Sequence, residues 1–258
     1  MNRFLSYELE HRVGSGGSAE VWRARTRDGR LVAVKLFNDH VSSGVERLRA
    51  GEPTRLARID HPRILKYLDA GRLPHEVETF EAGTEFIVTE FVAGPTLAAV
   101  RPPDWRWVQA VTLQLLDALA SAHARNIVHL DVKPTNVLLR GENPPDVLLA
   151  DFGIAHHFQY ESEPGAERPV VGTPGYMAPE QIRRYLAAFG PWTDVYSVGS
   201  LVYELCTGQP LFSGSPIDVL KAHARAPRPP LGKTRFAVPD DLGQWLGRCL
   251  VIDTTERF

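Results

Sequence analysis

The feature that most constrains this chain is a polar octapeptide, His129-Leu130-Asp131-Val132-Lys133-Pro134-Thr135-Asn136. An apolar pattern with helical spacing precedes it and the strand-like run Val137-Leu138-Leu139 follows it, so it is predicted to be a loop between a helix and a strand. Its carboxylate could orient a hydroxyl or accept its proton, its lysine could neutralise a transferring phosphoryl group, and its asparagine could hold a metal ion. A polar loop can also be a mere connection, but this combination of residue types favours phosphoryl transfer.

A second acidic position stands in Ala150-Asp151-Phe152-Gly153, at the end of the next apolar run. A carboxylate at a strand end, followed by glycine, suits Mg²⁺ binding beside phosphate groups. The tripeptide Asp151-Phe152-Gly153 taken alone is weak evidence for a magnesium site. It gains meaning from its place after the polar octapeptide.

A glycine-rich segment near the start runs Gly14-Ser15-Gly16-Gly17-Ser18-Ala19-Glu20-Val21 between two strand candidates. Glycines let the backbone approach a phosphate closely and turn without Cβ clashes. A plain hairpin turn explains the segment equally well on its own. A dinucleotide-binding loop fits poorly, because Val21 to Ala24 continue as a strand where that motif needs a helix.

The strand candidate Val32-Ala33-Val34-Lys35 ends on a lysine, which could meet nucleotide phosphates as a point charge. A surface lysine on an edge strand is the alternative. The chain has only five lysines against 24 arginines. A lysine kept in an apolar strand therefore favours a role that arginine could not fill.

The arrangement of elements divides the chain into a β-rich first part and a helical second part. Strands are predicted at residues 7–13, 19–25, 31–37, 65–70 and 84–91, and helices at residues 43–59, 105–125, 194–206 and 240–251. A long loop at residues 154–174 is expected to be functional or disordered.

The composition is that of an ordinary globular protein, with 43% apolar and 23% charged residues over 258 positions. A net charge of −2 gives no global reason to bind nucleic acid or anionic membrane. No apolar run approaches the length of a spanning helix, and the start lacks a signal-peptide pattern, so a soluble cytoplasmic protein is expected. Two cysteines cannot form a disulfide framework, and no Cys/His cluster has zinc-finger spacing.

Together with Gly172-Thr173-Pro174-Gly175-Tyr176-Met177-Ala178-Pro179-Glu180, these motifs, in this order, resemble the protein kinase fold, specifically the eukaryotic-like (Hanks-type) serine/threonine kinases of bacteria. The resemblance runs from about Tyr7 to Phe258. It implies an α+β, bilobal fold, with a β-rich first lobe (1–91, nucleotide-binding) that holds one main helix and a mostly helical second lobe (92–258, catalytic and substrate-binding). Small-molecule kinases of the aminoglycoside type share part of the pattern but lack the Ala178-Pro179-Glu180 segment.

The resemblance assigns roles to the polar residues. Lys35 would contact the α- and β-phosphates of ATP, paired with a glutamate of the first-lobe helix. Glu46 and Glu52 compete for that role, and Glu52 is chosen because Leu56 lies four residues later on the same face, where the family's hydrophobic spine needs an apolar residue. That spine would consist of Leu56, Tyr67, His129 and Phe152.

In the second lobe, Asp131 would be the catalytic base or hydroxyl orienter, and Lys133 would stabilise the transferring phosphate. Asn136 and Asp151 would hold Mg²⁺ (or Mn²⁺) ions that bridge the ATP phosphates. Asp194 would brace the catalytic loop, and Glu180 would form a structural ion pair with Arg257. The residues implied to bind the nucleotide are Val13, Gly14, Gly16, Gly17, Val21, Ala33, Lys35, the gatekeeper Thr89, the connector residues Glu90 and Val92, and Leu138.

The sequence departs from the family pattern at two places that bear on regulation. Leu130 replaces the arginine that usually pairs with a phosphate on the activation loop, and residues 154–171 contain no threonine and a single serine, Ser162. Activity independent of activation-loop phosphorylation is therefore expected. Pro53 beside Glu52 disfavours a helix interior. Either it stands in the first turn of a shortened helix, where proline is tolerated, or the helix is broken. The Lys35–Glu52 pair is therefore hypothesised to be conditional on a partner.

An active kinase that phosphorylates Ser/Thr hydroxyls of proteins is the leading interpretation, because every catalytic position is filled. A pseudokinase that acts as a nucleotide-responsive scaffold is the first alternative and a small-molecule kinase is the second. The expected partners are ATP, a protein substrate, and, as open candidates at the first-lobe helix, a second copy of the chain or a regulatory protein.

Overall fold

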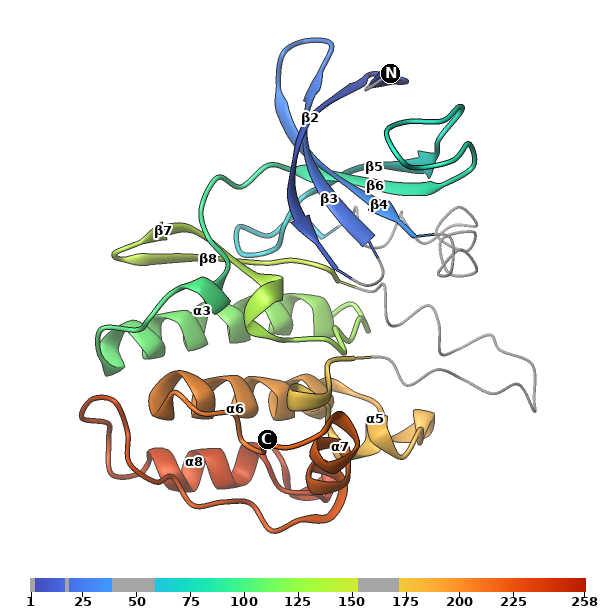
Figure 1. Ribbon diagram of the computed structural model, residues 1–258. Coiled ribbons are helices and arrows are strands. Elements are labelled where there is room, and N and C mark those ends of the chain that lie inside the picture. Colours follow the sequence, from blue (N-terminus) through green and yellow to red (C-terminus); the bar gives the residue numbers. More distant parts are fainter. Residues whose placement is uncertain (1–2, 17–18, 39–58, 153–171) are drawn as a thin grey trace. The chain divides into compact units, whose positions relative to one another are not determined.

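The computed structural model describes residues 3–16, 19–38, 59–152 and 172–258. The chain divides into two compact units (Figure 1). Unit 1 comprises residues 1–60 and 65–93, and unit 2 comprises residues 61–64 and 94–258. Each unit is described by itself below.

Unit 1 is built on a six-stranded antiparallel sheet in the order β1-β2-β3-β4-β6-β5. The predicted strand at residues 31–37 is confirmed without change, and the others match within a few residues. The strands are β1 (Arg3–Phe4), β2 (Tyr7–Ser15), β3 (Ala19–Thr26), β4 (Leu31–Phe37), β5 (Tyr67–Arg72) and β6 (Glu85–Glu90).

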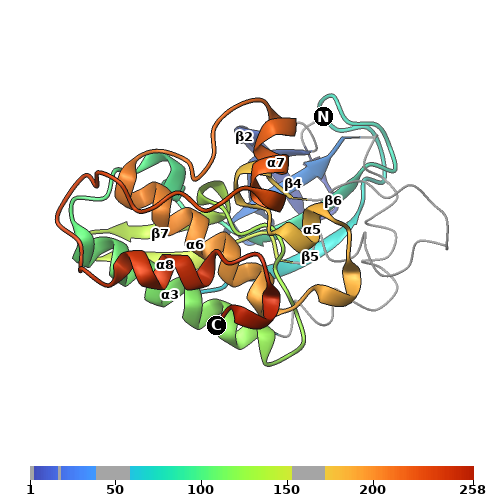
Figure 2. The same cartoon turned by 90° about the horizontal axis from the view of Figure 1, so that it is seen from below.

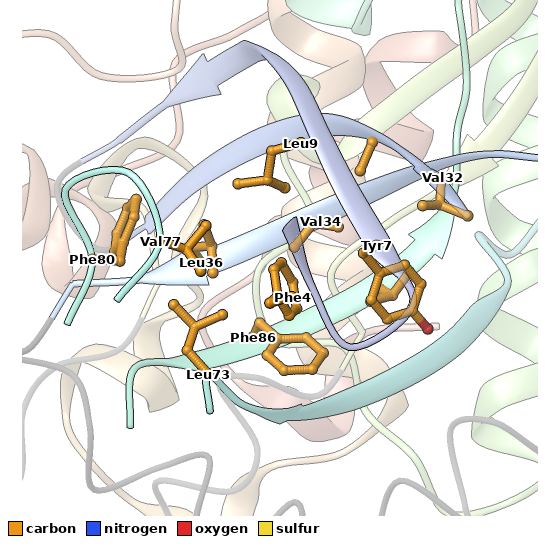
Figure 3. Close-up of a cluster of buried hydrophobic side chains, with 12 residues drawn as sticks. Phe4, Tyr7, Leu9, Val32, Val34, Leu36, Leu73, Val77, Phe80 and Phe86 are labelled. Atoms are coloured by element: carbon orange, nitrogen blue, oxygen red, sulfur yellow. The ribbon is translucent and has the colours of Figure 1, made fainter. Parts of the chain in front are cut away.

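One face of this sheet forms the core of unit 1 (Figure 3). Strand β4 alternates, so that Val32, Val34 and Leu36 are fully buried while the residues between them are half-buried. This is the period of two expected for a strand with one face in a core. The rings of Phe4 and Phe86 meet edge to face, with centroids 4.9 Å apart. The residues of the cluster are Phe4, Tyr7, Leu9, Ala24, Val32, Val34, Leu36, Leu73, Val77, Phe80, Phe86 and Val88.

Strand β5 begins two residues later than predicted, and the reason is the path of the preceding residues. Residues 61–64 belong to unit 2, where Ile64 forms a parallel bridge with Leu149 and the Leu149 N–H donates to the Arg63 carbonyl over 2.8 Å. The apolar run from Leu65 therefore begins at a crossing between units. Apolar periodicity alone does not reveal such a crossing.

Unit 2 is mostly helical and carries one two-stranded ribbon, β7 (Val137–Glu142) with β8 (Pro145–Leu149). Helix α6 packs against α3 and against α8 (Figures 1 and 2). The α-helices are α3 (Trp105–His123), α5 (Pro179–Ile182), α6 (Pro191–Thr207), α7 (Pro216–Arg225) and α8 (Leu242–Cys249). Short 3₁₀ turns lie at Leu97–Ala99 (η2), Pro134–Asn136 (η3), Pro174–Tyr176 (η4), Leu186–Ala188 (η5) and Thr254–Glu256 (η6).

Helix α3 forms where the apolar spacing predicted it. The carboxylate of Asp104 caps its first turn by accepting from the Trp107 N–H over 2.9 Å. Val108, Val111 and Leu115 lie on its buried face, each with no exposed surface. The helix therefore packs its apolar face against the core, and the polar octapeptide follows shortly after its C-terminal end.

Helix α6 starts three residues before the predicted Asp194. Pro191 occupies its first turn, where the missing N–H costs no hydrogen bond. The helix ends at Gly208, whose φ of +75° is a left-handed conformation that favours glycine. Cys206 on this helix and Cys249 on α8 are buried free thiols, and burial raises their pKa values to about 11 and about 12.

Gly94 marks the start of the long part of unit 2, at a close approach between two backbones. A Cβ at this position would lie 1.7 Å from the Leu139 carbonyl oxygen. The Leu139 N–H donates to the carbonyl of Pro95 over 2.9 Å, which draws the two segments together. Only glycine fits here.

Part of the sequence prediction lies outside the described residues. This applies to most of the helix at residues 43–59, with Glu46, Glu52, Pro53 and Leu56, and to residues 153–171, which include Ser162. Among the described residues, no helix is long and apolar enough to cross a membrane.

Candidate active site

The polar octapeptide lies between α3 and β7, and a buried carboxylate holds its first residues in place. Asp194 on α6 has no exposed surface. Its Oδ2 accepts the backbone N–H of His129 and its Oδ1 accepts that of Leu130, both over 2.8 Å. The ring Nε2 of His123, at the end of α3, lies 2.8 Å from the same carboxylate. The bracing role expected for Asp194 is therefore present in the structure.

His129 serves the loop as a structural residue. Its Nε2 lies 2.8 Å from the Ala150 carbonyl, which can only accept, and its Nδ1 lies 3.2 Å from the Asp131 N–H, which can only donate. These partners fix the neutral tautomer with the proton on Nε2. The ring also meets Phe152 edge to face at 4.6 Å, as expected for two members of the spine.

The carboxylate of Asp131 is the centre of a compact polar network. The Lys133 Nζ lies 2.6 Å from Asp131 Oδ2 and donates to the Thr173 hydroxyl over 2.7 Å. That hydroxyl donates to Asp131 Oδ1 over 3.1 Å. Both ionic side chains keep about a fifth of their surface exposed, 21% for Asp131 and 22% for Lys133. A carboxylate, an ammonium and a hydroxyl thus meet at a site that solvent can reach.

Asn136 closes this network from the other side and leaves its amide oxygen for another partner. Its Nδ2 donates to the Asp131 carbonyl over 2.8 Å and to Asp131 Oδ2 over 3.0 Å. The Ala150 N–H donates to the Asn136 carbonyl over 2.8 Å, which joins the residue before β7 directly to the residue before Asp151.

These residues fit a magnesium ion. An amide oxygen at Asn136 and a carboxylate at Asp151 are hard oxygen ligands, which Mg²⁺ prefers. Among the described residues there is no cluster of three or more His, Cys, Asp or Glu side chains that could cage a metal. Mg²⁺ is normally held by one or two protein oxygens with phosphates and waters, so two ligands suffice.

Two residues of this candidate site, the one before Asp131 and the proposed magnesium ligand Asp151, have unusual backbone conformations. Leu130 has a φ of +66° and Asp151 a φ of +60°, both in the left-handed region. Each such non-glycine residue costs about 1–3 kcal/mol, and such strain tends to occur at functional sites. The site is thus held by its surroundings rather than by local preference.

The segment Gly172–Glu180, which the resemblance assigns to substrate binding and which is called the substrate segment below, is anchored to the helices of unit 2. Ser197 on α6 donates to the Tyr176 carbonyl over 2.8 Å, and the Tyr176 hydroxyl donates to the Glu204 carboxylate. Burial, together with this hydrogen bond, raises the pKa of the Tyr176 phenol. The expected ion pair is present too, because the Arg257 guanidinium donates two hydrogen bonds, of 2.7 and 3.0 Å, to the Glu180 carboxylate.

In unit 1, four predicted nucleotide-binding residues share one face of the sheet. Ala33 and Lys35 project from β4 opposite the core face. Val21 on β3 is paired directly with Lys35, and Thr89 on β6 is paired with Ala33. Directly paired residues project to the same face. Arg23, paired with Ala33, also lies on this face.

The glycine-rich segment is the tip of the β2–β3 hairpin, as predicted. Gly14 pairs with Val21, and the Gly16 N–H donates to the Ala19 carbonyl over 2.9 Å. A register shift between Arg12 and Gly14 leaves Val13 at a bulge, with 47% of its surface exposed. Gly17 lies outside the described residues.

The connector after β6 is fastened to the sheet by Glu90. The Glu90 N–H donates to the Lys66 carbonyl over 3.0 Å, and its carboxylate accepts the Lys66 N–H over 2.9 Å. Phe91 follows, with the Arg23 guanidinium 5.5 Å from its ring centroid. Val92 is half-buried.

Leu138, the remaining predicted adenine contact, belongs to unit 2. It lies on β7, paired with Leu148, and is half-buried. Within unit 2 the structure joins Asp131, Lys133 and Asn136 by direct contacts. Within unit 1 it places Val21, Ala33, Lys35 and Thr89 on one face of the sheet.

Two contacts in and near the site were not predicted from the sequence. Arg23, which contacts Phe91, also pairs with Glu10 at 2.8 Å. Gln181 donates to the Leu130 carbonyl. A glutamine directly after Ala-Pro-Glu carries no sequence signal of such a contact, because the partner lies 51 residues away.

Comparison with known proteins gives the chain its family. The protein kinase domain family matches residues 7–258. The serine/threonine-protein kinase PkaA of Streptomyces coelicolor is 35% identical over 95% of this chain and 46% of its own length. PknB of Mycobacterium leprae is 35% identical (98% and 40% covered), and PknA of Mycobacterium tuberculosis is 36% identical (87% and 52% covered).

The chain therefore spans about half or less of the length of these relatives. Two crystal structures of the PknI kinase domain of Mycobacterium tuberculosis align over 99% of this chain at 25% identity, with TM-scores of 0.72 and 0.70. The alignments cover 91% and 92% of those chains. The fold is thus the kinase fold predicted from the motifs. This chain belongs to the protein kinase family, as a kinase domain similar to those of bacterial serine/threonine kinases.

Proposed function

We propose that this chain is an active serine/threonine protein kinase that transfers the γ-phosphate of ATP to a protein hydroxyl. The observation that carries the proposal is the network at Asp131, where Lys133 and Thr173 both contact the same carboxylate. A base, a cation for the phosphoryl group and a residue of the substrate segment are thus assembled at one point. This arrangement suits transfer to a hydroxyl.

The chemical step follows from the roles of these side chains. Asp131 orients the substrate hydroxyl and takes its proton as the oxygen attacks the γ-phosphorus. The new O–P bond forms while the bond to the ADP oxygen breaks, and Lys133 neutralises the charge on the transferring phosphoryl group. Asn136 and Asp151 would hold Mg²⁺, which neutralises phosphate charge when bound.

Unit 1 supplies the nucleotide contacts in this proposal. Lys35 would meet the α- and β-phosphates, and the face that holds Val21, Ala33 and Thr89 would contact adenine. Support comes from the strand pairing, which places these four residues on one face. The proposed Lys35–Glu52 ion pair and its dependence on a partner involve a residue outside the described ranges.

We further propose that activity does not require phosphorylation of the activation loop. The side chain of Leu130 is 1% exposed and carries no charge, so it cannot pair with a phosphate. The variant Ser162→Ala is expected to keep kcat within about twofold of the wild type. Phosphatase treatment should likewise leave the rate unchanged. Phosphorylated Ser162 in mass spectra, together with loss of activity in Ser162→Ala, would refute this proposal.

The proposed activity is tested by offering the protein labelled ATP, Mg²⁺ and either a model protein substrate or small hydroxyl compounds. Label on serine or threonine of the protein substrate is the expected result. Turnover of a small compound without protein phosphorylation would indicate a small-molecule kinase instead. Phosphoamino-acid analysis separates serine and threonine from tyrosine.

A further inference from the structure

The residue just before the catalytic aspartate is held in a conformation that it would not adopt by itself. Leu130 has a φ of +66° and a side chain that is 1% exposed. A Cβ-bearing residue in the left-handed region is disfavoured and persists only where its surroundings enforce it. One of these restraints is Asp194, which accepts the Leu130 N–H over 2.8 Å.

A second hydrogen-bond restraint on this residue comes from Gln181 in α5. Its Nε2 donates to the Leu130 carbonyl over 2.8 Å, and its Oε1 accepts the Ala178 N–H over 2.9 Å. The amide orientation is fixed, because one partner can only accept and the other can only donate. Gln181 is 3% exposed, so water cannot readily replace either bond.

These bonds join two parts of the site. Ala178 belongs to the substrate segment, whose Thr173 already donates to the carboxylate of Asp131 over 3.1 Å. Gln181 adds a second link from the end of that segment to the backbone immediately before Asp131. The carboxylate and its supporting backbone are therefore tied to the substrate segment separately.

We propose that Gln181 is a positioning residue for catalysis: its side-chain amide fixes the strained Leu130 peptide and thereby the direction of the Asp131 carboxylate. This restraint by Gln181 needs no phosphate group, because both hydrogen bonds join a neutral side-chain amide to backbone groups. This inference rests on the proposed kinase function. It explains how a catalytic loop with leucine at position 130 stays ordered for reaction.

The test compares Gln181→Met with a matched control, Gln114→Met. Gln114 makes the same pair of bonds, accepting from the Val147 N–H and donating to the Pro145 carbonyl, each over 2.9 Å, but it joins α3 to β8. Both variants lose two amide–backbone bonds. Only one of them loses a bond to the catalytic loop.

Gln181→Met is expected to lower kcat by about tenfold or more, with the KM for ATP within about twofold of the wild type. Gln114→Met should keep kcat near the wild-type value. Hydrogen–deuterium exchange of a peptide that covers residues 128–133 should be faster in Gln181→Met only. Thermal unfolding of each variant confirms that the protein assayed is folded.

Unchanged exchange in residues 128–133 and a kcat within twofold of wild type would overturn the inference, as would equal losses of kcat in both variants. If Gln181→Met does not fold, Gln181→Asn replaces it, since the shorter amide cannot span both partners. The exchange measurement does not depend on activity. A wild type that transfers no phosphate would contradict the proposed function, whereas the exchange result would still decide the role of Gln181 in the loop.

Discussion

Replacing Asp131 with asparagine is expected to lower kcat by about 10²- to 10⁴-fold, the contribution typical of a positioned general base. Asparagine has nearly the same shape, and its amide oxygen can still accept from Lys133 or Thr173. It cannot take a proton from the substrate hydroxyl. Steady-state rates with a protein substrate and saturating ATP measure the effect.

The control for this variant is Asp146→Asn in the same unit. Asp146 is 39% exposed in its side chain and pairs with Arg63 and Arg140 at the surface, away from the polar octapeptide. Its substitution should leave kcat unchanged. An Asp131→Asn protein that keeps more than about a tenth of the wild-type kcat would show that Asp131 is not the base.

Replacing Arg257 with methionine is expected to lower the free energy of unfolding by roughly 3–5 kcal/mol, because it leaves the buried carboxylate of Glu180 without its cationic partner. The side chains of Arg257 and Glu180 are 0% and 4% exposed, and they share two hydrogen bonds. Arg257 also donates to the Val251 carbonyl over 2.7 Å. Urea unfolding followed by circular dichroism measures the loss.

An exposed ion pair in the same chain serves as the comparison. Arg3 and Glu8 pair with side chains that are 67% and 53% exposed, so Arg3→Met should cost less than about 1 kcal/mol. The double variant Glu180→Gln/Arg257→Met should recover part of the loss, since no charge is left buried. A cost below about 1 kcal/mol for Arg257→Met would contradict this account of the pair.

Much of the fold could be predicted because its elements carry their own local signals. Strand β4 alternates buried and half-buried residues, and helix α3 repeats its apolar positions at helical spacing. The loop that bears Asp131 was predicted from residue chemistry, and the structure places Lys133 and Asn136 in direct contact with that carboxylate. Local patterns sufficed where the interacting residues are close in sequence.

What could not be predicted depends on contacts between distant residues. Nothing near Gln181 indicates that its amide reaches Leu130, and nothing near Thr173 shows that its hydroxyl donates to Asp131. The crossing of residues 61–64 into unit 2 likewise depends on pairing between Ile64 and Leu149. Such pairs form because burial must satisfy every polar group, and sequence spacing does not specify the partner.

The measurement that tests the central claim most directly is transfer of labelled phosphate from ATP with Mg²⁺, comparing the wild type with Asp151→Asn, alongside ATP binding by both proteins. Asp151 lies two residues after the end of β8 and is proposed as a magnesium ligand. The account predicts label on the protein or on a model substrate with the wild type and its loss in Asp151→Asn. Measurable ATP binding by the wild type without any transfer would contradict the account and favour a nucleotide-responsive scaffold.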